Sequence, residues 1–573
     1  MPTSVKVILG VACLFLLAAC GGGEEEEPTP TEVKVLTLHY WQAPSVPIPY
    51  LSSGFKDRDA GAVTLEPLAN YDPDGNIVPR LAAQVPTIEN GGVSSDLMSI
   101  TWKLKEGLLW SDETDVTAED VVFTWRYCVD EATGCTNESF FDGITSVEAL
   151  DGLTVKITFE APTPYPYNAF VGSATPIINS VQFAECIGAP AATCFEQNYA
   201  PLGTGPYRIT NFQENDRIAY ERNPHYHGAP PYFDRVILKG GGNAEAAARF
   251  VLERGDVDYA WNVQADPETL TGMQEAGLGT LAVAYTSLVE RIVVNQTNVD
   301  LDLGDDRSEY LDGENPHPFL SFKPIREAMS MAIDRTQIAE ELYGFAGEAT
   351  CNLITGPPIY VSTANEGCLT QDIEGAKRLL DENDVLDTDG DGTREYNGEP
   401  LRIVFQTSTN DIRQETQALI RDWWREIGIR TRIIDHDASV FFGGDPVEDK
   451  NASYRRFLAD VQMYASGTGI DPQQSLSDLL CRNIPTRDNN WSLGNFARSC
   501  DAEYDEVYSQ LEETRIGRER ETLVKQLNDL HVQSYFQIPL INRGFVSAHL
   551  NTLKGVRING WDSELWNIAE WRR

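Results

Sequence analysis

The sequence of 573 residues predicts an α/β fold, because strand and helix patterns alternate along the whole chain. A strand pattern at 100–104 is followed by a helix pattern at 117–128 and by a second strand pattern at 153–159. A strand–helix–strand unit follows at 401–434, where short turns favour a parallel pair and a right-handed crossover. No segment repeats with a period of 20–50 residues, which argues against solenoids and propellers.

The first element is an apolar run at 7–19, which follows the single early charge of Lys6. It is too short for an ordinary membrane span and is typical of a secretion signal, so 1–19 is predicted to be a signal peptide. The segment 17–20 (LAAC) is similar to the lipobox of bacterial lipoproteins, in which the cysteine is lipidated and begins the mature protein. Residues 20–32 are therefore predicted to be the lipidated Cys20 and a flexible acidic tether on the outer face of the cytoplasmic membrane.

The net charge of −42 comes from 87 acidic and 45 basic residues. Such a surface repels nucleic acid and anionic lipid headgroups, so neither is an expected partner. An acidic exterior also keeps an exported protein soluble. No other run approaches eighteen apolar residues, and no further membrane span is predicted.

Eight of the ten cysteines fall into close couples beyond the signal peptide and Cys20. Export to an oxidising compartment makes disulfides the expected state. Eight cysteines allow 105 pairings, and the clustering favours neighbour with neighbour. A zinc site is not indicated, because there is no C-x-x-C and no histidine accompanies a couple. The predicted bridges are Cys128–Cys135, Cys186–Cys194, Cys351–Cys368 and Cys481–Cys500.

The remaining elements follow from periodicity and capping residues. Ile100, Trp102 and Leu104 alternate as in a half-buried strand, and Thr117 with Asp120 forms a capping pattern at the start of the next helix. Helices are also predicted at 324–332 and 335–343, with a strand at 401–407, a helix at 411–427 and a strand at 429–435. A long helical stretch at 504–533 precedes a strand at 537–542.

Motifs of catalysis are absent from the sequence. There is no G-x-S-x-G elbow, no H-E-x-x-H, no Walker loop and no dinucleotide fingerprint. A pair of carboxylates of the glycosidase type can be neither singled out nor excluded in so acidic a chain. A binding protein that is not an enzyme is therefore expected.

One loop has the spacing of a calcium site. Asp387, Asp389 and Asp391 alternate and Gly392 follows, as in an EF-hand loop. The twelfth position, where an EF-hand needs a bidentate glutamate, is Gly398, and Glu395 and Glu399 are the candidate substitutes. A structural calcium ion and a plain acidic turn both remain open, and no other cofactor is required.

Five blocks of sequence carry a resemblance to a known family. The sequence resembles family 5 of the extracellular solute-binding proteins, the oligopeptide-, dipeptide- and nickel-binding components of ABC importers. The blocks are in family order and lie between about 33 and 545, which is nearly the whole mature chain. They are LEPLANYDPDG (65–75), WSDETDVTAEDVVFTW (110–125), PLGTGPYR (201–208), YERNPHY (220–226) and FKPIREAMSMAIDR (322–335).

The resemblance implies a two-lobed fold like that of the periplasmic binding proteins, in the large three-domain form of type II. Lobe 1 would combine 33–65, 200–287 and 536–573, with 66–199 as an extra domain II attached to it. Lobe 2 would be 288–535. The ligand would bind in the cleft between the lobes.

Candidate ligand-binding residues follow from the aromatic walls and few polar groups that such a cleft needs. They are Tyr40, Trp41, Trp261, Asn262, Asn295 and Tyr464, with Asp471 as a further candidate. Peptide binders of the family often have an aspartate just before an Asp-Pro pair, which holds the peptide amino terminus. Here that stretch is 466–472 (SGTGIDP), and only Asp471 remains, which leaves oligosaccharides and other solutes open.

The function expected from these features is that of a lipid-anchored, monomeric solute receptor for an ABC transporter permease. A peptide is the first candidate ligand, and an oligosaccharide or another small solute is the alternative. A secreted hydrolase is the alternative from a different class.

Overall fold

One mixed sheet of eleven strands runs through both lobes of the protein, which is known here from a computed structural model describing 33–573 except 53, 264 and 444–445. The predicted signal peptide, the tether and Cys20 lie outside these described residues. The strand order is β16-β15-β17-β11-β18-β10-β1-β9-β8-β7, and β12 pairs with β18. The bounds in that order are β16 (Arg430–His436), β15 (Arg402–Ser408), β17 (Val461–Thr468), β11 (Gly279–Val294), β18 (Gln537–Leu550), β10 (Tyr259–Trp261), β1 (Val35–Tyr40), β9 (Arg235–Gly240), β8 (Arg217–Arg222), β7 (Tyr207–Gln213) and β12 (Gly347–Ala349).

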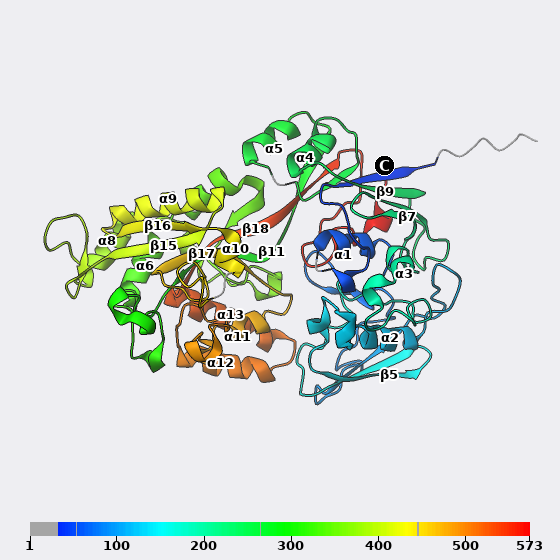
Figure 1. Ribbon diagram of the computed structural model, residues 1–573, viewed down its shortest axis with the longest axis horizontal. Coiled ribbons are helices and arrows are strands. Elements are labelled where there is room, and N and C mark those ends of the chain that lie inside the picture. Colours follow the sequence, from blue (N-terminus) through cyan, green and yellow to red (C-terminus); the bar gives the residue numbers. More distant parts are fainter. Residues whose placement is uncertain (1–32, 53, 264, 444–445) are drawn as a thin grey trace, which may run out of the picture.

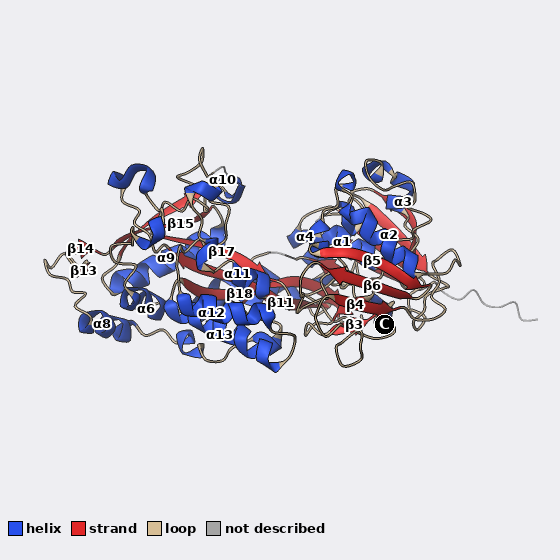
Figure 2. Cartoon of the chain, turned by 90° about the horizontal axis from the view of Figure 1, so that it is seen from below, coloured by secondary structure: helices blue, strands red, loops and turns tan. Residues whose placement is uncertain are grey.

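Two bodies stand side by side in Figure 1, and the long strands β11 and β18 pass from one to the other. Figure 2 shows the same two strands between the bodies from a second direction. β11 and β18 pair in antiparallel fashion along most of their length, with a break in register between Tyr285 and Val289. The sheet therefore joins the lobes directly, and its irregular point lies at the junction.

The junction sets where the chain changes lobe. Val546 and Ala548 of β18 pack in the core of lobe 1, whereas Ile538 and Leu540 pack in the core of lobe 2. Because β18 pairs with β11, both strands must cross at the same level, and Asn542 lies opposite Val289. The chain thus returns to lobe 1 inside β18 rather than at residue 536, where the sequence placed the boundary.

Lobe 1 consists of the β10-β1-β9-β8-β7 part of the sheet, with domain II attached. Domain II has its own three-stranded sheet in the order β4-β6-β5, a two-stranded sheet, β2 with β3, and a large core that includes Trp102 and Trp110. Helix α2 packs on β5 and β6. The bounds are α1 (Phe55–Ala62), β2 (Ala69–Tyr71), β3 (Ile77–Pro79), β4 (Ser99–Lys103), α2 (Ala118–Val129), β5 (Ile144–Asp151), β6 (Thr154–Phe159), α3 (Phe195–Tyr199), α4 (Ala244–Leu252) and α5 (Pro267–Gln274).

Lobe 2 covers the β16-β15-β17 end of the sheet with helices. Its main core joins α6, α8 and α9 to the strands, and α12 with α13 forms a separate cluster. The bounds are α6 (Lys323–Met331), α7 (Arg335–Ile338), α8 (Ile373–Glu382), β13 (Glu395–Tyr396), β14 (Glu399–Pro400), α9 (Asp411–Glu426), α10 (Ala438–Gly443), α11 (Gln473–Ser477), α12 (Ala502–Glu513) and α13 (Arg518–Ser534). A π-helix, Ala339–Tyr343, follows α7.

Several local predictions are confirmed. Thr117 and Asp120 form the predicted capping box at the start of α2. β15 and β16 are parallel and joined through α9, as the strand–helix–strand pattern predicts. The four predicted disulfides are formed among the described cysteines: Cys128–Cys135, Cys186–Cys194, Cys351–Cys368 and Cys481–Cys500.

The prediction of one long helical stretch at 504–533 is wrong. The chain forms two helices, α12 and α13, which are separated by the turn at 514–517. Gly517 has φ +143°, a conformation that few residues other than glycine adopt, and Arg520 packs against the end of α12. A break lets both helices present an apolar face to the same cluster.

Glycines also fix the joint between lobe 1 and domain II. A Cβ atom added to Gly203 would lie 2.0 Å from the carbonyl oxygen of Thr64, and the amide of Gly205 donates to the same oxygen at 2.8 Å. The GTGPY segment at 203–207 therefore makes a close backbone contact, which agrees with its interpretation as a turn.

Candidate functional site

Two cavities, each of about 310 Å³, lie on opposite sides of the junction between the lobes. The lobe 1 cavity is lined by Gln42, Gly54, Phe55, Lys56, Arg58, Asp59, Trp261, Asn262, Phe545, Asn559, Gly560, Asp562 and Glu564. The lobe 2 cavity is lined mainly by Arg291, Leu353, Ile354, Phe442, Tyr454, Tyr464, Ser466, Gly467, Thr468, Asp478, Phe496 and Gln537.

The two cavities meet the same strand at neighbouring positions. Phe545 of the lobe 1 cavity pairs with Ala284 of β11, and Thr468 of the lobe 2 cavity pairs with Ser287. Between these positions β11 contains the break in its register with β18. Both cavities therefore lie beside the part of β11 at which the chain crosses between the lobes.

Four predicted ligand residues come together in lobe 1. β1 and β10 are parallel neighbours and end at the same level, where Tyr40 pairs with Trp261. The two rings stack with centroids 5.1 Å apart and planes 6° apart. The indole nitrogen of Trp41 donates to the carbonyl oxygen of Asn262 at 3.0 Å. Of the four, Trp261 and Asn262 line the cavity, whereas Tyr40 is buried behind the Trp261 ring.

Two buried carboxyl groups line the same cavity. Asp59 of α1 is 2% exposed, and Glu564 is 7% exposed. The hydroxyl of Tyr40 donates to Oδ2 of Asp59 at 3.2 Å, and Oδ1 of Asp59 has no hydrogen-bond partner among the described residues. The hydroxyls of Tyr259 and Ser547 donate to Oε2 of Glu564.

The environment of these carboxyls disfavours their charged forms. Burial raises the pKa of Asp59, and burial together with the charge of Asp59 raises the pKa of Glu564 to about 7. Sequence reasoning did not single out either residue. In a chain with 87 acidic residues only burial distinguishes them, and burial is not visible in a local pattern.

The wall in lobe 2 combines an aromatic cluster with a buried arginine. The Tyr464 ring packs against Tyr454 at 5.5 Å and against Phe442 at 6.4 Å between ring centroids. Arg291 of β11 pairs with Tyr464 of β17 and is 7% exposed. Tyr464 is thus the predicted candidate that the structure places in this cavity.

Arg291 is held by neutral groups only. Its guanidinium donates to the carbonyl oxygens of Ser466 at 2.5 Å and Val289 at 3.2 Å, and to Oε1 of Gln537 at 3.2 Å. In the described part of the chain it makes no ion pair within 4 Å. Burial lowers the pKa of Arg291 to about 10, so it remains charged at neutral pH.

The remaining candidates, Asn295 and Asp471, do not line either cavity. Asn295 is fully buried, and its amide donates to the carbonyl oxygens of Phe457 and Ala459 and to the hydroxyl of Ser308. Asp471 accepts from Nη2 of Arg520 at 2.8 and 2.6 Å. Both side chains are used inside lobe 2.

A third cavity of about 520 Å³ lies between domain II and the rest of lobe 1. Arg80, Tyr226 and Trp566 are among the residues that line it. It contains none of the predicted ligand residues and no residue of lobe 2, so it is not a site between the lobes.

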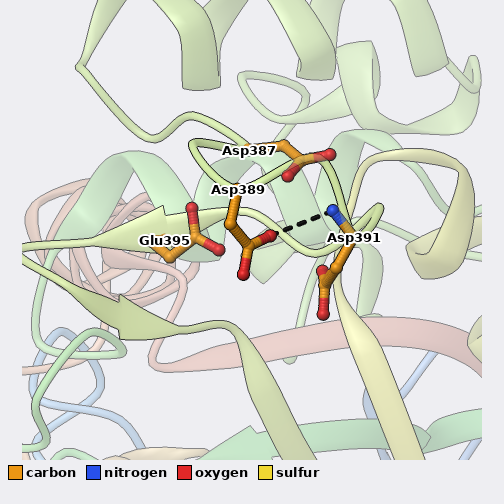
Figure 3. A group of neighbouring side chains, drawn as sticks. All are labelled: Asp387, Asp389, Asp391 and Glu395. Carbon is orange, nitrogen blue, oxygen red and sulfur yellow. Dashed lines mark hydrogen bonds between the residues drawn. The ribbon is translucent and has the colours of Figure 1, made fainter.

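The predicted calcium ligands do cluster. One ligand oxygen from each of Asp387, Asp389, Asp391 and Glu395 lies within 4.8 Å of the others (Figure 3). The loop is largely exposed, and backbone amides already donate to all four of these carboxylates, as that of Asp391 does to Asp389 at 2.9 Å. A bound cation would add its charge to a loop that is already ordered by such turns.

The sequence of the chain matches that of a known protein family. The sequence profile of the bacterial extracellular solute-binding proteins, family 5 Middle, matches 76–484, well over half of the chain. The chain belongs to this family. The fold class and the family predicted from sequence are thereby confirmed.

Relatives within family 5 are distant in sequence. The oligopeptide-binding protein AppA of Bacillus subtilis (strain 168) is 24% identical over 385 residues, which are 65% of this chain and 64% of AppA. The match thus spans slightly less than two thirds of AppA. The glutathione-binding protein GsiB of Escherichia coli (strain K12) is 25% identical over 473 residues, 82% of each protein.

A solved structure of this class has the same fold. The substrate-binding protein CtaP of an ABC transporter from Listeria monocytogenes superposes with a TM-score of 0.72 at 21% identity. The superposition covers 94% of this chain and 99% of CtaP. None of the helices among the described residues has the length and apolar character of a membrane span.

Proposed function

We propose that this solute-binding protein captures a peptide between its lobes and delivers it to the permease of an ABC transporter. The observation that carries the proposal is the pair of cavities beside the β11 junction, each with aromatic side chains and buried ionisable groups. Aromatic surface with a few placed polar groups suits a peptide. The names of AppA and GsiB, an oligopeptide and a glutathione binder, support the same class of ligand.

Binding is coupled to closure of the lobes. A ligand shifts a conformational equilibrium only through its different affinity for the two states, so it must contact both walls to favour the closed state. β11 and β18 are the elements that would bend, at the irregular point near Tyr285 and Val289. The closed form would then be the one that the permease recognises.

The test is a ligand screen on the purified protein. Tri- to hexapeptides are expected to raise the melting temperature and to bind with a ratio of one ligand per chain in calorimetry. Light scattering is expected to report a monomer with and without the peptide. Oligosaccharides and nickel chelates form the other arms. A response to those arms and none to peptides would contradict the proposed ligand class.

The protein is proposed to release its ligand unchanged, as a receptor and not as a hydrolase. Peptides and oligosaccharides incubated with it should be recovered intact by mass spectrometry. Cleavage that persists after further purification would favour the hydrolase alternative instead.

We further propose that Cys20 carries a lipid that holds the receptor on the outer face of the cytoplasmic membrane. The lipobox 17–20 and the acidic stretch that follows support this proposal. Metabolic labelling with a fatty acid should mark the wild type and not Cys20→Ser, and the variant should leave the membrane fraction. Equal labelling of both would contradict it.

Calcium at the loop of Asp387 is proposed as a structural ion only. Three aspartates and Glu395 offer the oxygen ligands that Ca²⁺ prefers. Titration of Ca²⁺ into chelator-treated protein should release or absorb heat in the wild type and not in Asp389→Asn. No heat in either would leave the loop as an acidic turn.

A further inference from the structure

The largest of the three cavities, about 520 Å³, lies where domain II meets the rest of lobe 1. One wall comes from domain II, and the other includes Tyr226, Tyr232 and the C-terminal segment 566–572. Its size is within the range of about 300–1,000 Å³ that is usual for small-molecule sites. No residue of lobe 2 lines it, so the proposed capture of a peptide between the lobes makes no use of this cavity.

Hydrogen bonds across the joint fix the two walls of the cavity relative to one another. Oδ2 of Asp562, in the C-terminal segment, accepts from the amide nitrogen of Asn70 at 2.8 Å, and its Oδ1 accepts from the backbone amide of Ser173 at 2.8 Å. Nη2 of Arg80 donates to the carbonyl oxygen of Trp566 at 2.9 Å. The cavity is therefore formed without a ligand, as binding sites for small molecules usually are.

Some polar groups of the lining are not used inside the protein. Ser173 is 4% exposed, and its Oγ has no hydrogen-bond partner among the described residues. Nε of Arg80 donates to Oδ1 of Asn70 at 2.7 Å, which together with the bond from Nη2 leaves Nη1 for a ligand. Glu66 is 5% exposed, and its Oε2 lies 2.8 Å from Nε2 of His227. A buried polar group without a partner is stabilised when a ligand supplies the missing hydrogen bond.

Aromatic rings form the apolar part of the lining. Tyr226, Tyr232 and Trp566 all line the cavity. The indole nitrogen of Trp566 donates to the carbonyl oxygen of Arg557 at 2.8 Å, and the guanidinium of Arg80 lies 5.8 Å from the centre of the indole ring. Burial raises the pKa of Tyr226 to about 12, so its hydroxyl is neutral at neutral pH. Such rings suit a ligand that has an apolar face and a polar edge.

The charges of the lining are balanced. Arg80 and Arg572 are its cations, and Glu66 and Glu570 are its anions. A ligand with one strong charge meets a like charge in the same cavity, which opposes its binding. A neutral ligand with several hydroxyl groups can instead donate to a carboxylate and accept from a guanidinium. A sugar ring meets these conditions, because its hydroxyls lie around its edge and its C–H groups form apolar faces.

We infer that the cavity between domain II and the rest of lobe 1 binds a neutral saccharide, at a site separate from the cleft between the lobes. The rings of Tyr226 and Trp566 pack on the C–H face of the sugar. Ser173, Arg80 and Glu66 form hydrogen bonds to its hydroxyls. The inference does not depend on the proposed peptide function. Since lobe 2 does not contact this site, saccharide binding requires no closure of the lobes.

The first experiment is a calorimetric titration of saccharides into the full-length protein. The probes are glucose, N-acetylglucosamine, maltose, cellobiose and chitobiose, with glucuronate and glucosamine as charged counterparts. At least one neutral probe is expected to bind once per chain and to raise the melting temperature. The charged counterparts should bind about tenfold more weakly, because the cavity holds both signs of charge. Absence of binding by all neutral probes, or tighter binding of a charged one, overturns the inference.

Variants of the lining locate the site. Ser173→Ala removes a hydroxyl that has no partner in the protein, so its melting temperature should not fall, whereas its saccharide affinity should fall about fivefold. Trp566→Leu removes the stacking ring and should lower the affinity about tenfold. If the saccharide binds to both variants as it does to the wild type, the inference is overturned.

Ser453→Ala is the matched control for Ser173→Ala. Ser453 is in lobe 2, is 1% exposed and also has an unpartnered hydroxyl among the described residues, but it lines none of the three cavities. This variant should bind the saccharide like the wild type. An equal loss of affinity in Ser453→Ala and Ser173→Ala would reflect a general effect on the fold and would overturn the assignment of the site.

Two further measurements separate this site from the cleft. Trp261→Ala changes the lobe 1 cavity beside the junction and should leave saccharide affinity unchanged. A saturating saccharide should change the affinity for a peptide by less than about twofold, because separate sites act independently. Loss of saccharide binding in Trp261→Ala, or competition with the peptide, would place the saccharide in the cleft and overturn the inference. Saccharide binding without any peptide binding would contradict the proposed function alone.

Discussion

Asp59 in lobe 1 and Asp471 in lobe 2 are both largely shielded from solvent, but their hydrogen-bond partners differ. Asp471 is paired with a buried arginine through two short hydrogen bonds, whereas Asp59 has one tyrosine hydroxyl and an oxygen without a partner. The first is part of the structure of lobe 2, and the second lines the lobe 1 cavity with one oxygen unpaired. The position of Asp471 in the 466–472 stretch does not show whether its carboxylate is paired with a cation.

The surrounding elements explain the difference. Asp471 precedes α11, and Arg520 comes from α13, so their ion pair links two elements of the same lobe. Asp59 comes from α1 and Glu564 from the C-terminal segment, and both line the lobe 1 cavity. The predictions below test this contrast between structural and available polar groups.

The largest effect is expected for Arg520→Ala. The substitution leaves the buried Asp471 without its charged partner and removes hydrogen bonds to the carbonyl oxygens of Leu511 and Thr514. Loss of one partner of a buried ion pair costs about 3–5 kcal/mol of unfolding free energy. Urea unfolding measures it, and the double variant Arg520→Ala/Asp471→Asn should recover part of the loss. A loss below about 1 kcal/mol would contradict a structural role for this pair.

Asn295→Ala is expected to cost about 3 kcal/mol of unfolding free energy without changing ligand affinity. The amide donates to the oxygens of Phe457, Ala459 and Ser308, and it accepts from the amide and hydroxyl of Thr297. Its loss leaves buried groups of Ala459 and Thr297 without these partners, whereas the Ser308 hydroxyl still donates to the carbonyl of Phe457. Trp261→Ala is the matched comparison, because this ring lines the lobe 1 cavity. Trp261→Ala should weaken ligand binding tenfold or more. If Asn295→Ala weakens binding and Trp261→Ala does not, the two roles are the reverse of those expected here.

Glu564→Gln should change how stability depends on pH. The folded-state pKa of Glu564 is raised from 4.5 to about 7, so between these values the unfolded chain loses the proton while the folded chain keeps it. The contribution of Glu564 to the unfolding free energy of the wild type is therefore largest below pH 4.5. It falls as the pH rises from 4.5 to 7 and is constant above pH 7. Asp59, Arg58 and Tyr259 face the same carboxyl and remain in the variant.

The variant lacks this titration, so it should gain about 3 kcal/mol relative to the wild type between pH 4.5 and 7.5, at about 1.4 kcal/mol per pKa unit. Thermal and urea unfolding at both pH values measure the difference. Parallel pH profiles for the two proteins would show that burial does not raise the pKa of Glu564.

The smallest effect is the expected difference in unfolding free energy between the loss of one disulfide and the loss of another. The bridge Cys481–Cys500 in lobe 2 closes a separation of 19 residues, and Cys128–Cys135 in domain II closes one of 7. On the loop-entropy relation the longer bridge contributes about 3 kcal/mol and the shorter about 2.4 kcal/mol. Double Cys→Ala variants of each pair, compared by urea unfolding, should differ by less than about 1 kcal/mol. If removal of the shorter bridge costs more unfolding free energy than removal of the longer one by over about 1 kcal/mol, strain or denatured-state structure determines the contribution of these disulfides.

Much of the fold was predictable because its signals are local. The capping box of Thr117 and Asp120, the parallel β15–β16 pair and the neighbouring cysteines each depend on residues close in sequence. The break between α12 and α13 was missed, because Gly517 is one glycine within a stretch that otherwise has helical composition. Packing of both helices on one cluster decides the turn there.

The sequence-based candidates lie partly at the cavities. Tyr40, Trp41, Trp261 and Asn262 were predicted as aromatic and polar residues near strand-like segments, and the parallel pairing of β1 with β10 brings them together. Tyr464, predicted in the stretch VQMYASGTGIDP, lines the lobe 2 cavity. The sequence did not indicate Asp59, Glu564 and Arg291, because their burial depends on distant partners, such as Tyr259 beside Glu564.

The sequence by itself determined the family, the order of the elements and the cysteine couples, because motifs and periodicity are properties of neighbouring residues. Only the tertiary structure decided which carboxyl groups are paired with a cation and which are not. The availability of a carboxylate depends on whether a distant side chain such as Arg520 reaches it, and on how much water is excluded from it. Those are properties of packing in three dimensions, and they separate Asp59 from Asp471.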